Sequence, residues 1–158
     1  MHKLSTFLWF NGQAEEAANF YTRIFRDAKI KTVMRYGDAG PGPKGEVLTV
    51  EFEAYGHHFV ALNGGSSFSF TPAISFMIHC ASQSEVDELW DNLLSGGGEP
   101  MQCGWLKDKY GVAWQVTPDK LMQMINDPDP EKAKRVMQAM MQMVKLDLPA
   151  LEKAYAGI

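Results

Sequence analysis

The sequence predicts an α+β fold built from two βαβββ modules and followed by C-terminal helices. An apolar run at residues 7–10 has a counterpart 69 residues later, at residues 76–79, and the helical segments that follow the two runs align without a gap. Each copy then continues with β-like runs on either side of a tyrosine–glycine turn, at Tyr55-Gly56 and Tyr110-Gly111. Two half-sheets can enclose a pocket that neither forms alone, so the duplication also predicts a cavity.

The first module is predicted to span residues 1–65. Residues 4–10 are apolar at alternate and intervening positions alike, which predicts a central strand covered on both faces. Apolar residues at helical spacing follow, and they predict a helix over 13–26. A strand over 29–36 and a glycine- and proline-rich loop come next, before a hairpin formed by 46–54 and 57–63 around Tyr55-Gly56.

The second module is predicted to span residues 66–118, beginning with a strand at 73–80. Ser82 and Glu85 have the spacing of a capping box at the start of a helix, and Gly96 suits its left-handed end. Strands are expected at 101–106 and 112–117. Residues 119–158 form a helical extension, in which Asp129-Pro130 marks one helix start. The whole chain is expected to be one compact domain.

Composition excludes several classes of function. A net charge of −4 argues against a broad basic surface for nucleic acid, and no apolar run approaches the ~20 residues of a membrane span. Two cysteines, Cys80 and Cys103, are too few for a disulfide scaffold and suit a reducing compartment. No signal peptide is evident, and we expect a cytoplasmic protein without nucleic-acid or membrane partners.

Three motifs carry a resemblance to a known family. They are residues 7–12 (FLWFNG), residues 61–65 (ALNGG) and, most specifically, residues 103–116 (CGWLKDKYGVAWQV). With these motifs the chain resembles the PhnB-like group of the vicinal oxygen chelate superfamily, a group that also carries the label 3-demethylubiquinone-9 3-methyltransferase. Glyoxalase I, extradiol dioxygenases and antibiotic-resistance proteins share that superfamily. The methionine-rich tail also resembles this group.

The resemblance implies a glyoxalase-like arrangement and a homodimer. Each module would form a curved mixed sheet with helices on its convex face, and the concave faces would surround a cavity. The exact activity of the family is poorly defined. A Rossmann methyltransferase core is not expected, because the chain has no G-x-G-x-x-G motif and does not alternate single strands with helices.

Metal-using relatives place histidine or glutamate ligands on strands that face the cavity. Carried over to this chain, those positions fall at Leu4 or Thr6, at Ala61 or Asn63, at Ala73 and at Gln115. Only the Gln115 amide could coordinate an ion, and it is a weak ligand. A register shifted by one residue offers no better set, so we expect no metal and no other cofactor. The adjacent His57 and His58 are interpreted as solvated hairpin residues.

The pocket is predicted to use aromatic and small polar side chains. The predicted ligand-binding residues are Trp9, Asn63, Ser75, Cys103, Trp105 and Gln115. If Gln115 faces the cavity, strand alternation places Trp114 under a helix instead. Core packing is the alternative role for part of the tryptophan set, and Cys103 is expected to be unreactive. The methionine-rich helices are read as core or dimer packing, with a lid as the alternative.

These observations favour a small-molecule binding protein, or an uncharacterised enzyme, with a metal-free pocket. No catalytic residue is assigned. The first alternative is a metal-dependent lyase, isomerase or dioxygenase of the superfamily. The second is the methyltransferase that the family label implies.

Overall fold

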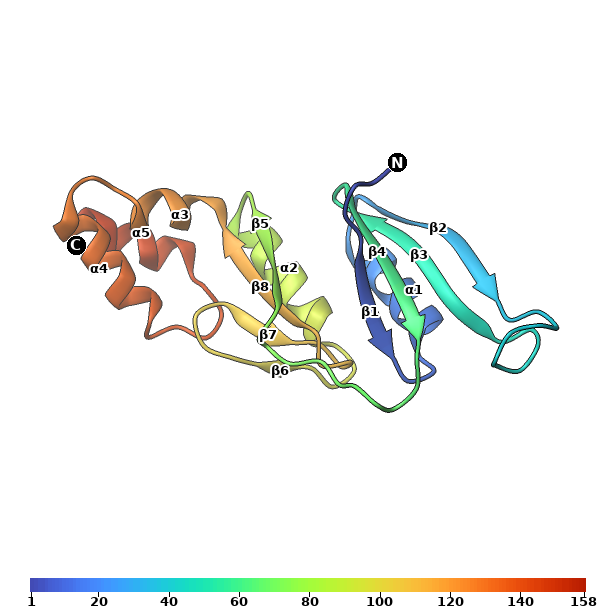
Figure 1. Cartoon of the computed structure of the whole chain (residues 1–158). Helices are drawn as coiled ribbons and strands as arrows, with labels where there is room; N and C mark the ends of the chain where they lie inside the picture. The colour runs from blue at the N-terminus through green and yellow to red at the C-terminus, as the bar shows by residue number, and fades with distance from the viewer. The chain divides into compact units, whose positions relative to one another are not determined.

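The computed structural model describes all residues from 1 to 158, and the chain divides into two compact units, Met1–Phe70 and Thr71–Ile158. Figure 1 labels the helices and strands of both units along the chain. None of the helices combines the length and apolar character that a membrane-spanning helix requires.

The first unit has the predicted βαβββ order. Its elements are β1 (Thr6–Phe10), α1 (Ala14–Ile24), β2 (Ala28–Arg35), β3 (Val47–Ala54) and β4 (His57–Asn63). The strands form one mixed sheet in the order β1-β4-β3-β2, in which β1 runs parallel to β4 and the other neighbours are antiparallel. Within this sheet β1 is an edge strand, and 62% of Phe7 is exposed. The expectation of a central strand covered on both faces is therefore wrong for this unit.

Helix α1 covers one face of the first sheet, which we call its helix face; the opposite side is its far face. Tyr21 of α1 stacks on Phe52 at 5.8 Å between ring centroids, and Phe52 stacks on Phe59 at 5.0 Å. Leu8 and Ala61 are buried on the same face, since each pairs in register with the other. This apolar layer is the core of the unit.

The second unit repeats the plan and adds three helices. Its elements are β5 (Ser75–Cys80), α2 (Gln83–Leu94), β6 (Glu99–Pro100), β7 (Trp105–Lys107), β8 (Ala113–Pro118), α3 (Asp119–Ile125), α4 (Pro130–Met140) and α5 (Leu148–Ala156). The sheet order β5-β8-β7-β6 matches that of the first unit strand for strand. The duplicated βαβββ plan predicted from the sequence is thus confirmed. The finer boundaries at residues 65 and 118, and a cavity shared by the modules, stay predictions.

The caps of α2 follow the sequence signals closely. The Ser82 hydroxyl accepts a hydrogen bond from the Glu85 amide at 3.2 Å, as a capping box requires. The Glu85 carboxylate reaches back to the Ala81 amide at 2.8 Å, one residue earlier than the expected partner. Gly96 adopts a left-handed φ of +83°, which ends the helix.

The predicted strand at 101–106 is broken, because its middle pairs with a distant loop. The Cys103 amide donates to the Met143 carbonyl at 2.8 Å, and the Gly104 amide donates to the Val144 carbonyl at 2.7 Å. Cys103 has a φ of +60° and Gly104 a φ of +82°, so neither residue continues an extended strand. Only Trp105–Lys107 returns to the sheet as β7.

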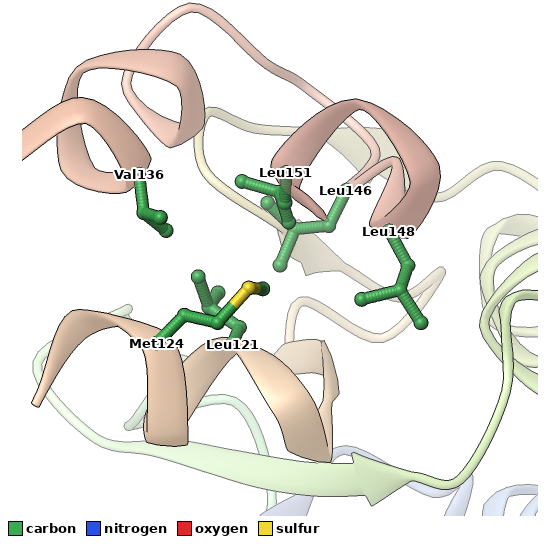
Figure 2. Close-up of a cluster of buried hydrophobic side chains, with 6 residues drawn as sticks. All are labelled: Leu121, Met124, Val136, Leu146, Leu148 and Leu151. Atoms are coloured by element: carbon green, nitrogen blue, oxygen red, sulfur yellow. The ribbon is translucent and has the colours of Figure 1, made fainter. Parts of the chain in front are cut away.

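The three C-terminal helices surround a hydrophobic cluster of their own. Figure 2 shows its buried members, which are Leu121, Met124, Val136, Leu146, Leu148 and Leu151. Met140 and Met143 pack against the cluster, whereas 60% of Met141 is exposed. The core interpretation therefore holds for part of the methionine set.

Candidate functional site

Three of the predicted pocket residues meet on the far face of the second sheet, the side opposite α2. Trp105 on β7 pairs in register with Gln115 on β8, so both side chains point to the same face. The Gln115 side-chain amide donates to the Ser75 hydroxyl of β5 at 2.8 Å. All three residues are partly buried. The Trp105 indole therefore lies on the same face as the hydrogen-bonded pair of Gln115 and Ser75.

Strand alternation sends Trp114 to the helix face, as the sequence predicted for a Gln115 that faces the cavity. Trp114 is 3% exposed and lies 5.3 Å from the ring centroid of Phe76. Its indole N–H donates to the carboxylate of Asp108 at 2.9 Å. The buried Trp114 thereby fixes which face of β8 carries Gln115.

Asp108 is a buried carboxylate that the sequence analysis did not single out. It is 3% exposed, and its Oδ1 atom accepts hydrogen bonds from the amides of Tyr110 and Val112 at 2.9 and 3.1 Å. Its Oδ2 atom accepts from Trp114. An aspartate a few residues before a glycine is a common turn signal, and it could have identified this role. Asp108 holds the turn between β7 and β8, and so positions Trp105 against Gln115.

The two cysteines differ in their surroundings. Burial, aided by the charge of Glu85, raises the pKa of the Cys80 thiol to about 12, so this group stays protonated at neutral pH. Cys103 is partly buried just before β7, where its backbone amide bonds to the Met143 carbonyl of the C-terminal segment. Cys103 is a free cysteine, and no hydrogen bond or ion pair joins its thiol to a base. The geometry suits a lining residue better than a nucleophile.

Trp9 lies on the far face of the first sheet, where it pairs in register with Leu62. Its indole N–H donates to the Gly65 carbonyl at 2.9 Å, and its ring meets Phe68 edge-on at 4.9 Å. A Cβ on Gly64 would lie 2.4 Å from the indole, so only glycine allows this close packing. The segment after β4 therefore sets the orientation of Trp9.

Asn63 lies on the helix face, opposite Trp9. Its Oδ1 atom accepts from the amide of Ala14, the first residue of α1, at 2.9 Å, and its side-chain amide donates to the Val47 carbonyl at 3.1 Å. It also borders a hollow of about 470 Å³, lined by Gly12, Glu15, Tyr36, Gly42, Pro43, Glu46, Val47 and Asn63. Ala61 and Asn63 thus share the face of the first sheet that α1 covers, and whether that face borders the predicted cavity stays a prediction. The residues on both faces of β4 are largely apolar, so the alternation of side chains in the sequence could not show which face Asn63 occupies.

The donor set on the far faces does not fit the superfamily's metal. The far face of the first sheet carries Phe7, Trp9 and Leu62 as well as Glu51 and His58, and the second sheet offers Ser75 and Gln115. Of these residues, only Glu51 and His58 are strong metal ligands. Nowhere in residues 1–158 do three histidine, cysteine, aspartate or glutamate side chains gather in a way that could hold an ion.

A polar cluster on the far face of the first sheet was not predicted. The Ser5 hydroxyl lies 2.6 Å from His58 Nδ1, and His58 Nε2 lies 3.3 Å from a carboxylate oxygen of Glu51. The His2 ring stacks on His58 at 4.4 Å, and only 11% of the His58 side chain is exposed. The interpretation of His58 as a solvated hairpin residue is therefore wrong. His2, close to the N-terminus, is itself bonded to Glu53 at 2.9 Å.

Comparison with known proteins places the chain in a family. The family model described as 3-demethylubiquinone-9 3-methyltransferase matches residues 2–117, which is most of the chain. The chain belongs to this family. The match ends before α3, so the C-terminal helices lie outside it even though their sequence also suggested a resemblance.

Solved structures agree with this membership. A PhnB protein from Bacillus cereus is 37% identical, with a TM-score of 0.67 over 74% of this chain and 99% of that one. Protein PA1353 from Pseudomonas aeruginosa shares the fold at 19% identity, with a TM-score of 0.62 over 75% of this chain and 98% of that one. No curated protein matches the chain. The PhnB-like resemblance read from the motifs is confirmed.

Proposed function

We propose that this PhnB-family protein binds a small organic molecule on the far face of its second sheet, without a metal ion. The arrangement of Ser75, Trp105 and Gln115 supports the proposal most directly. The bond between Gln115 and Ser75 uses one amide hydrogen and one hydroxyl lone pair. It leaves the Ser75 hydroxyl hydrogen as a donor and the Gln115 Oε1 atom as an acceptor.

These groups favour a ligand with a flat apolar body and a polar head. The Trp105 indole offers an aromatic surface for the body, and aromatic contacts of this kind add to the stabilisation from burial. A head that both donates and accepts, such as a carboxamide, matches the hydroxyl and the amide oxygen. Cys103 borders the same region, next to β7, and would contribute apolar contact. The Trp9 indole and the Asn63 amide remain proposed ligand contacts of the first unit, where Asn63 also borders the hollow beside α1.

The methyltransferase in the family's name is the second candidate function, and it rests on that name alone. The sequence contains no G-x-G-x-x-G loop for a nucleotide cofactor, and the two βαβββ units do not form a doubly wound sheet. Calorimetry with S-adenosylmethionine tests it, and a micromolar dissociation constant would revive it.

Benzamide is a suitable probe, since it combines an aromatic ring with a donor and acceptor head. We expect ¹H–¹⁵N spectra to show shifts at the Trp105 indole and the Gln115 side-chain amide on titration. Gln115→Leu should weaken binding about tenfold, in keeping with the loss of a hydrogen bond of ~1.4 kcal/mol. Gln142→Ala, at an exposed glutamine of the tail, is the matched control and should leave the affinity unchanged. Unchanged binding in Gln115→Leu would remove the support for this site.

We also propose that the protein is a cytoplasmic homodimer. Each sheet ends in edge strands with unpaired backbone groups, and natural proteins usually cover or pair such edges. Light scattering coupled to gel filtration should give a mass twice that of one 17.7 kDa chain. A monomer mass at micromolar concentration would contradict the dimer.

A further inference from the structure

We propose that Ser5, His58 and Glu51 form a nucleophilic site that accepts acyl groups from activated esters. The site lies on the far face of the first sheet, in the other unit from Ser75, Trp105 and Gln115. It therefore goes beyond the binding function and does not depend on it.

For the neutral imidazole, the two hydrogen bonds of His58 select one tautomer. A carboxylate oxygen can only accept, so the contact with Glu51 at 3.3 Å requires the ring hydrogen on Nε2. Nδ1 then presents a lone pair to the Ser5 hydroxyl at 2.6 Å. A hydroxyl that donates to an imidazole, which in turn donates to a carboxylate, is the arrangement that activates serine nucleophiles.

Three segments of the chain build this arrangement. Glu51 on β3 pairs with Val60, which lies two residues from His58 on β4, so the side chains of Glu51 and His58 share a face. Ser5 lies just before β1, which runs parallel to β4 on its other side. We call Ser5, His58 and Glu51 the relay. Strand pairing within the first sheet holds these three residues next to one another.

Surrounding groups limit the access of water to the imidazole but leave the serine accessible. The His2 ring stacks on His58 with an angle of 9° between the planes, and His2 itself is tied to Glu53. The His58 side chain is 11% exposed, while Ser5 is only partly buried. The low exposure of the ring strengthens its interaction with Glu51 when the imidazolium forms, while the 42% exposure of the Glu51 side chain lets solvent screen part of that interaction.

The proposed reaction balances with an ester and water alone. The Ser5 oxygen attacks the ester carbonyl carbon, its proton moves to His58 Nδ1, and the alkoxide leaving group departs with that proton. Water then attacks the acyl-serine, gives its proton to His58, and releases the carboxylic acid as Ser5 recovers its hydrogen. Ser5 and His58 are the catalytic residues in this scheme, and Glu51 is a positioning residue.

The test uses p-nitrophenyl acetate with the full-length protein, and peptide mass spectrometry locates the acetyl group. We expect Ser5 to be acetylated about 100-fold faster than the exposed Ser67, in line with the usual contribution of a general base. His58→Gln should remove most of that difference. His57→Gln is the matched control, since His57 contacts the Thr6 hydroxyl at 2.9 Å and lies outside the proposed relay.

The positioning role of Glu51 is tested by a measurement that a general loss of stability would not change. The ¹⁵N shifts of the His58 ring should report the Nε2–H tautomer in the native protein and a mixture in Glu51→Gln. Glu51→Asp should restore part of the acetylation rate. Circular dichroism melts of every variant separate loss of the nucleophile from loss of the fold.

Two results would overturn the proposal. One is acetylation of Ser5 no faster than that of Ser67 in the native protein. The other is an acetylation rate at Ser5 that stays the same in folded His58→Gln. Either result would leave benzamide binding at Gln115 untouched, so the two proposals fail separately.

Discussion

Removing the Asp108 carboxylate is the most informative perturbation of the fold around the candidate ligand site. Asp108→Ala leaves three buried or partly buried donors, on Tyr110, Val112 and Trp114, without their acceptor. A hydrogen bond to a charged group contributes about 1.5–3 kcal/mol, but water will reach part of the vacated space. We expect the free energy of unfolding to fall by about 3–5 kcal/mol, which places the substitution among the severe ones.

Urea denaturation followed by tryptophan fluorescence measures this change, and a double-mutant cycle isolates one part of it. Asp108→Asn keeps an oxygen for the two backbone amides but turns a second donor toward the Trp114 indole. Trp114→Phe removes that indole N–H, so the combined variant should lose less stability than the sum of the single changes. A loss below 1 kcal/mol for Asp108→Ala, or strict additivity in the cycle, would refute the role assigned to this carboxylate.

Three further predictions follow from single contacts. Gln83→Ala removes a 2.7 Å acceptor from the Leu148 amide and should speed hydrogen exchange there by about tenfold, while unchanged exchange would argue against the contact. Asn63→Ala removes the acceptor of the first amide of α1 and a donor to the Val47 carbonyl, and should lower the free energy of unfolding by about 1–3 kcal/mol in chemical denaturation; an effect near zero would contradict these contacts. Iodoacetamide at pH 8 should label Cys103 in the native protein and spare Cys80, whose pKa of about 12 keeps it a thiol until far higher pH; labelling of both at equal rates would be inconsistent with the burial of Cys80.

Local signals in the sequence were sufficient for much of the fold. The hairpin of β3 and β4 was predicted because Tyr55-Gly56 favours a tight turn, and both residues adopt positive φ, at +51° and +76°. The start of α2 was predicted from Ser82 and Glu85, which do form the expected cap. Features of this kind depend on residues a few positions apart, and the chain alone encodes them.

Features that depend on distant partners were missed. The break at Cys103 arises because its amide bonds to Met143, forty residues away in sequence. The relay of Ser5 and His58 joins residues 53 positions apart, and only the pairing of β1 with β4 brings them together. The face of Asn63 could not be predicted, because its strand is apolar on both sides and the alternation carries no signal.

Metal content is the measurement that tests the central claim most directly. The claim is that this family member recognises its ligand with neutral side chains around Trp105 and Gln115 rather than with a bound ion. Plasma mass spectrometry of protein purified without a histidine tag should find every divalent transition metal far below one equivalent per chain. One equivalent of nickel, zinc, iron or manganese that survives dialysis would contradict the account.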